Sequence, residues 1–256
     1  MNFLKKALQE KGNALGTFLS VTNVPIMEGL GYTGLDFVVI DTEHGPYDTM
    51  QMSDLIIAAE RSGMAPVVRV ADVTHKEIQR AVDNGAQGII VPCLRTIEEF
   101  KKVIELTKYA PIGNRGFIKA RGAGFGNEPW ADVSLVEYMK NSNERVLVLP
   151  QCETQEALDI IEDIVKLEGI DGIFIGPFDL SICMGIPGEF TNPKFKAAIT
   201  RIMNACHEVG KLCMIFTTST QDASHYFADG MDAVANSIDT ITFINAYKTM
   251  TKEIYR

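Results

Sequence analysis

The stretch Gly169-Ile-Asp-Gly-Ile-Phe-Ile-Gly-Pro-Phe-Asp-Leu-Ser181 decides the fold that we predict for this chain. It predicts a short buried strand, Ile173–Ile175, that runs directly into Gly-Pro and an acidic residue, Asp179. Upstream, the run VLVLPQCET (146–154) repeats the pattern and ends near Glu153. Two parallel strands that end side by side in single carboxylates place oxygen ligands where a hard divalent cation can bind. The pattern therefore predicts a parallel sheet and a metal-dependent enzyme.

Short apolar runs of this kind recur along the whole chain. Most are rich in Val and Ile without polar alternation, as expected of strands buried on both faces of a parallel sheet. Segments with helical periodicity separate them, for example Asp48–Arg61 and Lys194–Val209. This α/β alternation predicts one (β/α)8 TIM barrel domain over residues 1–256. The predicted strands are Leu15–Leu19, Phe37–Ile40, Pro66–Val70, Gly88–Val91, Val146–Leu149, Gly172–Ile175, Leu212–Phe216 and Ala233–Ala235.

Composition and charge disfavour several classes of partner. The formal net charge of −9 argues against nucleic acid and against an anionic membrane surface, which both favour a basic face. No run approaches about 18 consecutive apolar residues, so we expect no membrane span. The five cysteines show no metal-binding spacing, and the first residues lack the uncharged run of a secretory signal. We therefore expect reduced cysteines and a cytoplasmic protein.

Polar residues after the second and third predicted strands are candidates for catalysis. TIM-barrel enzymes hold their catalytic groups on the loops that follow the carboxyl ends of the strands. Arg69 lies among valines, where it would be costly unpaired, so it either pairs with Asp41 or binds an anionic ligand. His44 can exchange protons near neutral pH, with Asp41 or Glu43 orienting it. These residues predict a cation and a base in one pocket.

The two carboxylates after the fifth and sixth predicted strands complete that pocket. Glu153 and Asp179 offer two oxygen ligands and leave positions for water and a chelating substrate, as suits Mg²⁺ or Mn²⁺. A metal, a cation and a base suit proton abstraction next to a carbonyl, with electrostatic stabilisation of the enolate. No predicted strand ends in a lysine, which disfavours a Schiff-base aldolase. No GxGxxG or Walker motif supports a nucleotide role.

Several segments also resemble the HpcH/HpaI aldolase family. They follow the family's order across almost the whole chain: GTFLS (16–20), DFVVIDTEHGP (36–46), VVRV (67–70), NGAQGIIVP (84–92), PIGNRG (111–116) and GPFDLS (176–181). The resemblance implies a (β/α)8 barrel and a metal-dependent, class II pyruvate aldolase. Such enzymes reversibly cleave a 4-hydroxy-2-oxo acid to pyruvate and an aldehyde. It also implies a homo-oligomer, a trimer or a hexamer, with a C-terminal helix exchanged between subunits.

The resemblance assigns roles to matching residues. It implies that Glu153 and Asp179 bind the divalent metal (Mg²⁺, Mn²⁺ or Co²⁺) and that Arg69 binds pyruvate. It makes His44, paired with Asp41, the catalytic acid/base. It further places Gln151 in the pocket wall and the backbone of Gly176, Pro177 and Phe178 at the pyruvate carboxylate.

Two departures from the family pattern concern the aldehyde partner. Phe178 is bulkier than the family's usual small residue before the metal-binding aspartate, and the segment 116–126 is shorter than expected. Within that segment, Lys119 and Arg121 either bind a distal carboxylate of the aldehyde or lie in a solvated loop. Arg115 is interpreted as structural or as a subunit contact. The residues that the resemblance assigns to the metal and to pyruvate are all present. The identity of the aldehyde stays open.

Other functions remain as alternatives. One is a lyase for a CoA thioester of the citryl or malyl type, which requires a basic, adenine-accommodating surface. Another is a non-catalytic paralogue that binds a 2-oxo acid. The apolar C-terminal segment 241–247 either exchanges between subunits or closes its own barrel.

Overall fold

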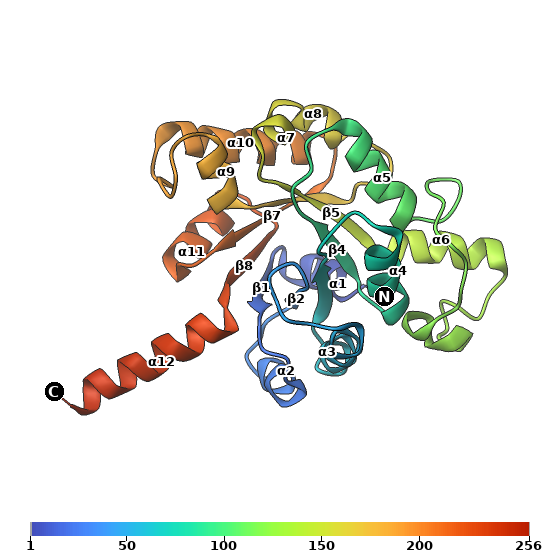
Figure 1. Ribbon diagram of the computed structural model, residues 1–256, viewed down its shortest axis with the longest axis horizontal. Helices are drawn as coiled ribbons and strands as arrows, with labels where there is room; N and C mark the ends of the chain where they lie inside the picture. Colours follow the sequence, from blue (N-terminus) through green and yellow to red (C-terminus); the bar gives the residue numbers. More distant parts are fainter. Residues whose placement is uncertain (1, 256) are drawn as a thin grey trace.

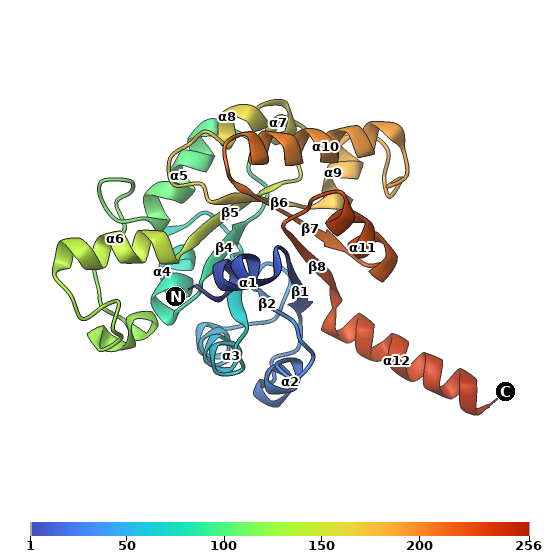
Figure 2. The same cartoon turned by 180° about the vertical axis from the view of Figure 1, so that it is seen from behind.

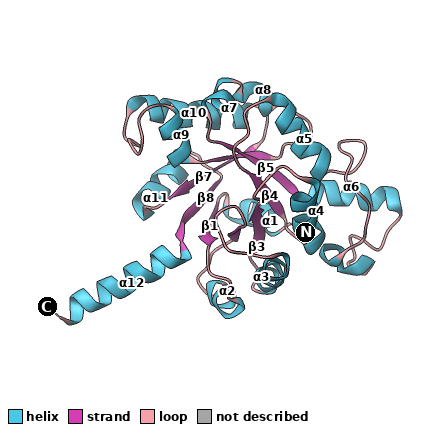
Figure 3. Ribbon diagram, viewed as in Figure 1, coloured by secondary structure: helices cyan, strands magenta, loops and turns pink. Residues whose placement is uncertain are grey.

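The computed structural model of the protein describes residues 2–255 and contains a closed barrel of eight parallel strands in chain order. Figure 1 and Figure 3 show the strands at the centre and helices around them. The predicted (β/α)8 barrel is therefore confirmed, and each strand overlaps its predicted run. The strands are β1 (Ala14–Leu19), β2 (Phe37–Asp41), β3 (Ala65–Arg69), β4 (Gly88–Val91), β5 (Leu147–Cys152), β6 (Gly172–Ile175), β7 (Leu212–Thr217) and β8 (Ala233–Ile238).

The helices connect successive strands on the outside of the barrel. Thr96 and Glu99 form the capping box predicted at the start of α5, and Asp48 with Gln51 forms a second one at α3. Within residues 2–255, no helix has both the length and the apolar character to cross a bilayer. The helices that alternate with strands are α2 (Val24–Leu30), α3 (Thr49–Arg61), α4 (His75–Asn84), α5 (Ile97–Thr107), α6 (Leu135–Arg145), α7 (Gln155–Asp159), α8 (Ile161–Ile164), α9 (Pro177–Cys183), α10 (Pro193–Glu208) and α11 (Thr220–Ala228).

Two apolar layers explain why the strand sequences show little polar alternation. Residues such as Val39 and Leu149 point into the barrel, whereas Ile40 and Ile175 pack between strands and helices. The first helix, α1 (Phe3–Lys11), contributes its buried residues to the inner layer. It thereby packs against the apolar interior of the barrel.

The long connection between α5 and α6 is anchored away from the barrel mouth. Arg115 is buried and forms an ion pair with Asp83 at 2.6 Å, and Arg121 pairs with Glu60 at 2.6 Å. Lys119 donates to two backbone carbonyls of the same connection. The structural interpretation of Arg115 is supported. Within one chain, these contacts hold Lys119 and Arg121 away from the barrel mouth. They are therefore not placed to bind a distal carboxylate of the aldehyde, which was one of the two roles that the sequence suggested.

The last helix, α12 (Asp239–Ile254), leaves the barrel instead of covering it. Figures 1 and 2 show it projecting from the body of the molecule, and none of its residues is buried. Just before it, Ser237 has a left-handed backbone (φ 66°) and the β1–β8 register shifts. The carboxylate of Asp239 then accepts hydrogen bonds from the amide and hydroxyl of Ser20. The alternative in which this segment closes its own barrel is therefore wrong.

Candidate active site

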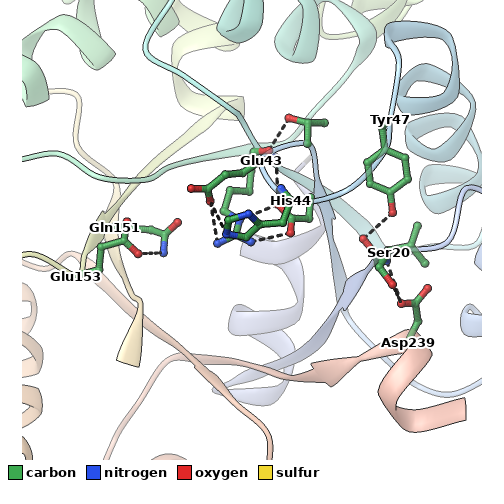
Figure 4. Close-up of polar contacts among 11 residues, drawn as sticks. Ser20, Glu43, His44, Tyr47, Gln151, Glu153 and Asp239 are labelled. Atoms are coloured by element: carbon green, nitrogen blue, oxygen red, sulfur yellow. Dashed lines mark hydrogen bonds and ion pairs between the residues drawn. The ribbon is translucent and has the colours of Figure 1, made fainter. Parts of the chain in front are cut away.

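A cavity of about 240 Å³ lies at the carboxyl end of the strands, where the sequence placed the chemistry. Its wall on the β1 side is fixed by the Tyr47 hydroxyl, which donates to the Leu19 carbonyl at 2.6 Å, and by the Ser20–Asp239 contact (Figure 4). The predicted residues that line it are Asp41, His44, Arg69, Gln151, Gly176, Pro177, Phe178 and Asp179. Residues from β2, β3, β5 and α9 therefore converge on one space.

Arg69 is the central cation of the site. It is the register partner of Asp41 across β2 and β3, and it donates to both carboxylate oxygens, from Nε at 2.8 Å and from Nη2 at 2.6 Å. Its Nη1 lies 3.0 Å from Oε2 of Glu43. These contacts raise the pKa of Arg69 against the opposing effect of burial, which is the largest single cause. The pairing with Asp41 that the sequence suggested is present, and it holds the guanidinium rigidly beside the cavity.

His44 lies at the cavity mouth with a side chain that is 74% exposed. Both oxygens of Asp41 are occupied by Arg69, and only the backbone amide of His44 donates to Asp41, at 3.4 Å. The imidazole Nε2 instead lies 3.9 Å from Oε2 of Glu43 (Figure 4). The structure thus departs from the expected His44–Asp41 pair, because the arginine competes for the same carboxylate.

Glu43 is the carboxylate that lies beside His44, and the sequence offered it together with Asp41 as the group that orients the imidazole. Its Oε2 is buried and accepts no hydrogen bond from any described residue, although Arg69 is close. Burial raises the pKa of Glu43, and the charge of Arg69 only partly opposes the shift. Its place beside His44 in the TEHG sequence is the signal that indicated this role. The ion pair with Arg69 is therefore the contact that balances the charge of this buried oxygen.

This shift gives a pH-dependent contribution to stability. Because folding raises the pKa of Glu43 above 4.5, the folded state holds a proton that the unfolded state has already lost. Its contribution to stability therefore falls as pH rises from 4.5 through the raised pKa. In EDTA-treated protein, we expect Glu43→Gln to have a higher Tm than the wild type, because the glutamine carries no charge. The difference in Tm should grow as the pH rises from about 4 to about 8. A difference in Tm that stays constant over this range would contradict the assignment.

Glu153 is held at the end of β5 by two hydrogen bonds. The Cys93 amide donates to Oε1 at 2.6 Å, and the Gln151 side-chain amide donates to Oε2 at 2.6 Å. Burial raises the pKa of Glu153; the Cys93 amide opposes this, and nearby Asp179 adds to it. Cys93 has a left-handed backbone (φ 61°), which aims its amide at the carboxylate. No pattern of side chains in the sequence indicates such a backbone contact, so the sequence did not indicate a role for Cys93.

Asp179 enters the cavity from the first turn of α9, one residue after Phe178. The Gly176 just before the helix is required by a close approach. A Cβ at this position would lie 2.5 Å from Oε2 of Glu153 and 2.9 Å from the Gln151 nitrogen. Only glycine therefore allows β5 and α9 to bring their polar side chains together.

These residues fit a divalent cation held by two carboxylates. Burial and mutual repulsion between Glu153 and Asp179 favour a positive charge between them, and the buried Oε1 of Gln151 has no partner in the described chain. Mg²⁺ commonly takes one or two protein carboxylates and fills its other positions with water and substrate. Among residues 2–255, no group of three or more His, Cys, Asp or Glu side chains is arranged to hold a metal. A cation held by Glu153 and Asp179 alone would keep its other positions for water or a chelating ligand.

Comparisons with known proteins find relatives of one kind, and the matches cover most or nearly all of this chain. A family model described as HpcH/HpaI aldolase/citrate lyase matches residues 14–246. A 5-keto-4-deoxy-D-glucarate aldolase of Shigella dysenteriae is 33% identical over 246 residues, which cover 96% of this chain and 93% of the relative. An HpcH/HpaI aldolase structure from Desulfitobacterium hafniense aligns with a TM-score of 0.91 at 27% identity, over 99% and 97% of the two chains. The citrate synthase SbnG aligns with a TM-score of 0.85 at 27% identity, over 98% and 96%.

Proposed function

The chain belongs to the HpcH/HpaI aldolase/citrate lyase family, and we propose that it is a divalent-metal-dependent aldolase that reversibly cleaves a 4-hydroxy-2-oxo acid to pyruvate and an aldehyde. The observation that carries the proposal is the position of Arg69 in the same cavity as Asp179, next to Glu153. A cation, the buried carboxylate of Glu153 and the exposed carboxylate of Asp179 beside one small cavity suit a chelating 2-oxo acid. The name of the 33% identical relative supports aldol chemistry.

Arg69 is the group that binds the oxo acid. Asp41 and Glu43 fix the guanidinium on the barrel side, and its remaining N–H groups are free to donate to an oxygen of the substrate. The same groups stabilise negative charge that develops as the carbon–carbon bond breaks, without reorganisation of the site. The backbone of Gly176, Pro177 and Phe178 borders the cavity where the substrate carboxylate lies.

His44 moves the proton. Its exposed imidazole at the cavity mouth accepts the proton of the C4 hydroxyl as the C3–C4 bond breaks, and Glu43 stabilises the resulting imidazolium. The aldehyde leaves, and the pyruvate enolate is protonated at C3. A divalent cation bound by Glu153 and Asp179 would supply Lewis-acid polarisation of the 2-oxo group. His44, Arg69 and Asp179 line the same cavity, and Glu153 lies close enough to act on the charge of Arg69.

The test is exchange of the pyruvate methyl protons with deuterium, followed by NMR. It requires no knowledge of the aldehyde, because it reports enolate formation alone. We expect exchange with Mg²⁺, Mn²⁺ or Co²⁺ and none after EDTA treatment. Folded protein that shows no exchange with any of these metals would remove the aldolase proposal.

The same proposal includes a homo-oligomer formed through α12. Its exposed apolar residues Phe243, Tyr247, Met250 and Ile254 recur at helical spacing, so they form one stripe. A free helix with such a stripe is unstable in water. The departure of α12 also leaves apolar side chains of β1 and α2 exposed, and a cavity of about 580 Å³ lies between α2 and α3. A second copy can cover this surface with its own α12.

We expect Phe243→Asp combined with Tyr247→Asp to convert an oligomer into monomers. Two charges in the middle of the stripe would be buried unpaired in the interface, which is costly. Light scattering coupled to size-exclusion chromatography measures the mass of both proteins. Lys248→Asp, on the same helix, is the matched control for added negative charge. A wild type that is monomeric at high concentration would refute the oligomer.

A further inference from the structure

Phe178 separates the active-site cavity from a second, larger cavity. The two spaces have volumes of about 240 Å³ and about 860 Å³, and both are lined by Pro177, Phe178 and Phe216. The larger one extends over α10 and α11, away from the polar residues of the site. The ring of Phe178 therefore belongs to a wall that both cavities share.

Aromatic contacts hold this ring in place although it is 42% exposed. On one side it meets the Phe190 ring edge to face, with centroids 5.0 Å apart at 86°. On the other side it lies 6.1 Å from Phe216, whose ring packs edge to face on Phe18. The backbone is fixed as well, because the Phe178 carbonyl accepts a hydrogen bond from the Ser181 hydroxyl at 2.7 Å. The shared wall is thus formed by Phe178 packed between the Phe190 and Phe216 rings.

The part of the cavity next to this wall is mostly apolar. Arg69, Gln151 and Asp179 mark the side that binds the oxo acid, and Ser20, Asp41 and His44 are the other polar residues of the lining. The apolar side chains are those of Phe18, Leu19, Phe174, Phe178, Phe216 and Ile238. Arg69 and His44 carry the only basic groups among the residues that line the cavity in the described chain. Arg69 is already paired with Asp41 and Glu43. In the proposed reaction the remaining N–H groups of Arg69 bind the oxo acid and His44 moves the proton, so within one chain no cation of the lining is left for a carboxylate on the acceptor.

We propose that Phe178 determines acceptor specificity by closing the aldehyde half of the cavity, so that the enzyme takes short, uncharged, apolar aldehydes. The inference rests on the proposed aldolase function and adds the chemical class of its second substrate. In the condensation direction, pyruvate loses a C3 proton, C3 bonds to the aldehyde carbon, and the aldehyde oxygen gains a proton. The growing product extends from C4 toward the shared wall, where the Phe178 ring stops it.

The experiment compares the wild type with Phe178→Ala for three aldehydes: propanal, hexanal and succinic semialdehyde. Condensation with pyruvate gives kcat/KM for each. We expect the wild type to prefer propanal over succinic semialdehyde by about tenfold or more. Phe178→Ala joins the two cavities, so we expect the ratio of hexanal to propanal to rise by about tenfold. Phe178→Leu, which keeps apolar bulk, should give an intermediate ratio and secures the test if the alanine variant does not fold.

Met203→Ala is the matched control. Met203 lines only the larger cavity, so its truncation enlarges that cavity without opening the shared wall, and the acceptor ratio should stay at the wild-type value. Pyruvate methyl exchange, which needs no acceptor, is measured for every variant. If both Phe178 variants still exchange the pyruvate methyl protons but keep the wild-type ratio of hexanal to propanal, the role of Phe178 is refuted. The aldolase proposal then stands. Absence of exchange in the wild type overturns the aldolase proposal and this inference together.

Discussion

Replacing Arg69 with alanine should abolish turnover and also destabilise the fold. The guanidinium is the only cation that contacts both Asp41 and Glu43 among the described residues, and both carboxylates are largely buried. Its loss leaves them facing each other without compensation, which we expect to cost about 3 kcal/mol of unfolding free energy. Removing a preorganised donor to the developing enolate should lower the rate by at least about 100-fold. Pyruvate methyl exchange and urea unfolding measure the two effects.

A second substitution separates the effects of Arg69 on stability and on catalysis. In the double variant Asp41→Asn with Arg69→Ala, one of the two unpaired charges is gone and Glu43 no longer faces a second carboxylate, so part of the stability should return. Turnover should not return, because no donor faces the oxo acid. An Arg69→Ala protein that exchanges pyruvate protons at nearly the wild-type rate would show that Arg69 is not the substrate-binding cation.

Replacing Glu153 with glutamine should abolish metal-dependent exchange while stabilising the metal-free protein. The amide has the same shape, and its oxygen can still accept from the Cys93 amide. Burial raises the pKa of Glu153, which means that the ionised carboxylate opposes folding at neutral pH when no cation is bound. We therefore expect a higher Tm in EDTA and a loss of Mn²⁺ affinity of at least about 100-fold. Calorimetric titration with Mn²⁺ and thermal unfolding measure these changes.

Glu156→Gln provides the matched control for Glu153. Glu156 is exposed in the helix that follows β5 and pairs with Arg95 at the surface, at 2.7 Å. The same chemical change there should alter neither Mn²⁺ affinity nor exchange. If Glu153→Gln binds Mn²⁺ as tightly as the wild type, the metal site lies elsewhere and the proposed function loses its chelating centre.

The sequence alone was sufficient for the barrel and for the residues near its mouth. Strands buried on both faces need apolar side chains at every position, so the runs around Val39 and Ile175 identify them without knowledge of the fold. In a parallel barrel all carboxyl ends of strands meet at one end, so Asp41, Arg69 and Asp179 had to lie near one another. These placements follow from local pattern and topology.

Only the tertiary structure decided which of these groups contact one another. Two carboxylates compete for Arg69, and the geometry of β2 and β3 gives both oxygens of Asp41 to the arginine and leaves His44 beside Glu43. The Cys93 amide reaches Glu153 through a backbone conformation that no side-chain pattern encodes.

Longer-range features depended on packing in the same way. The helix α12 leaves the barrel just after the register shift between β1 and β8. The wall at Phe178 is made of rings from α9, β7 and the loop before α10. Sequence patterns report what a segment buries, whereas partner choice depends on distances between segments that are far apart in the chain. Those distances exist only once the barrel has closed.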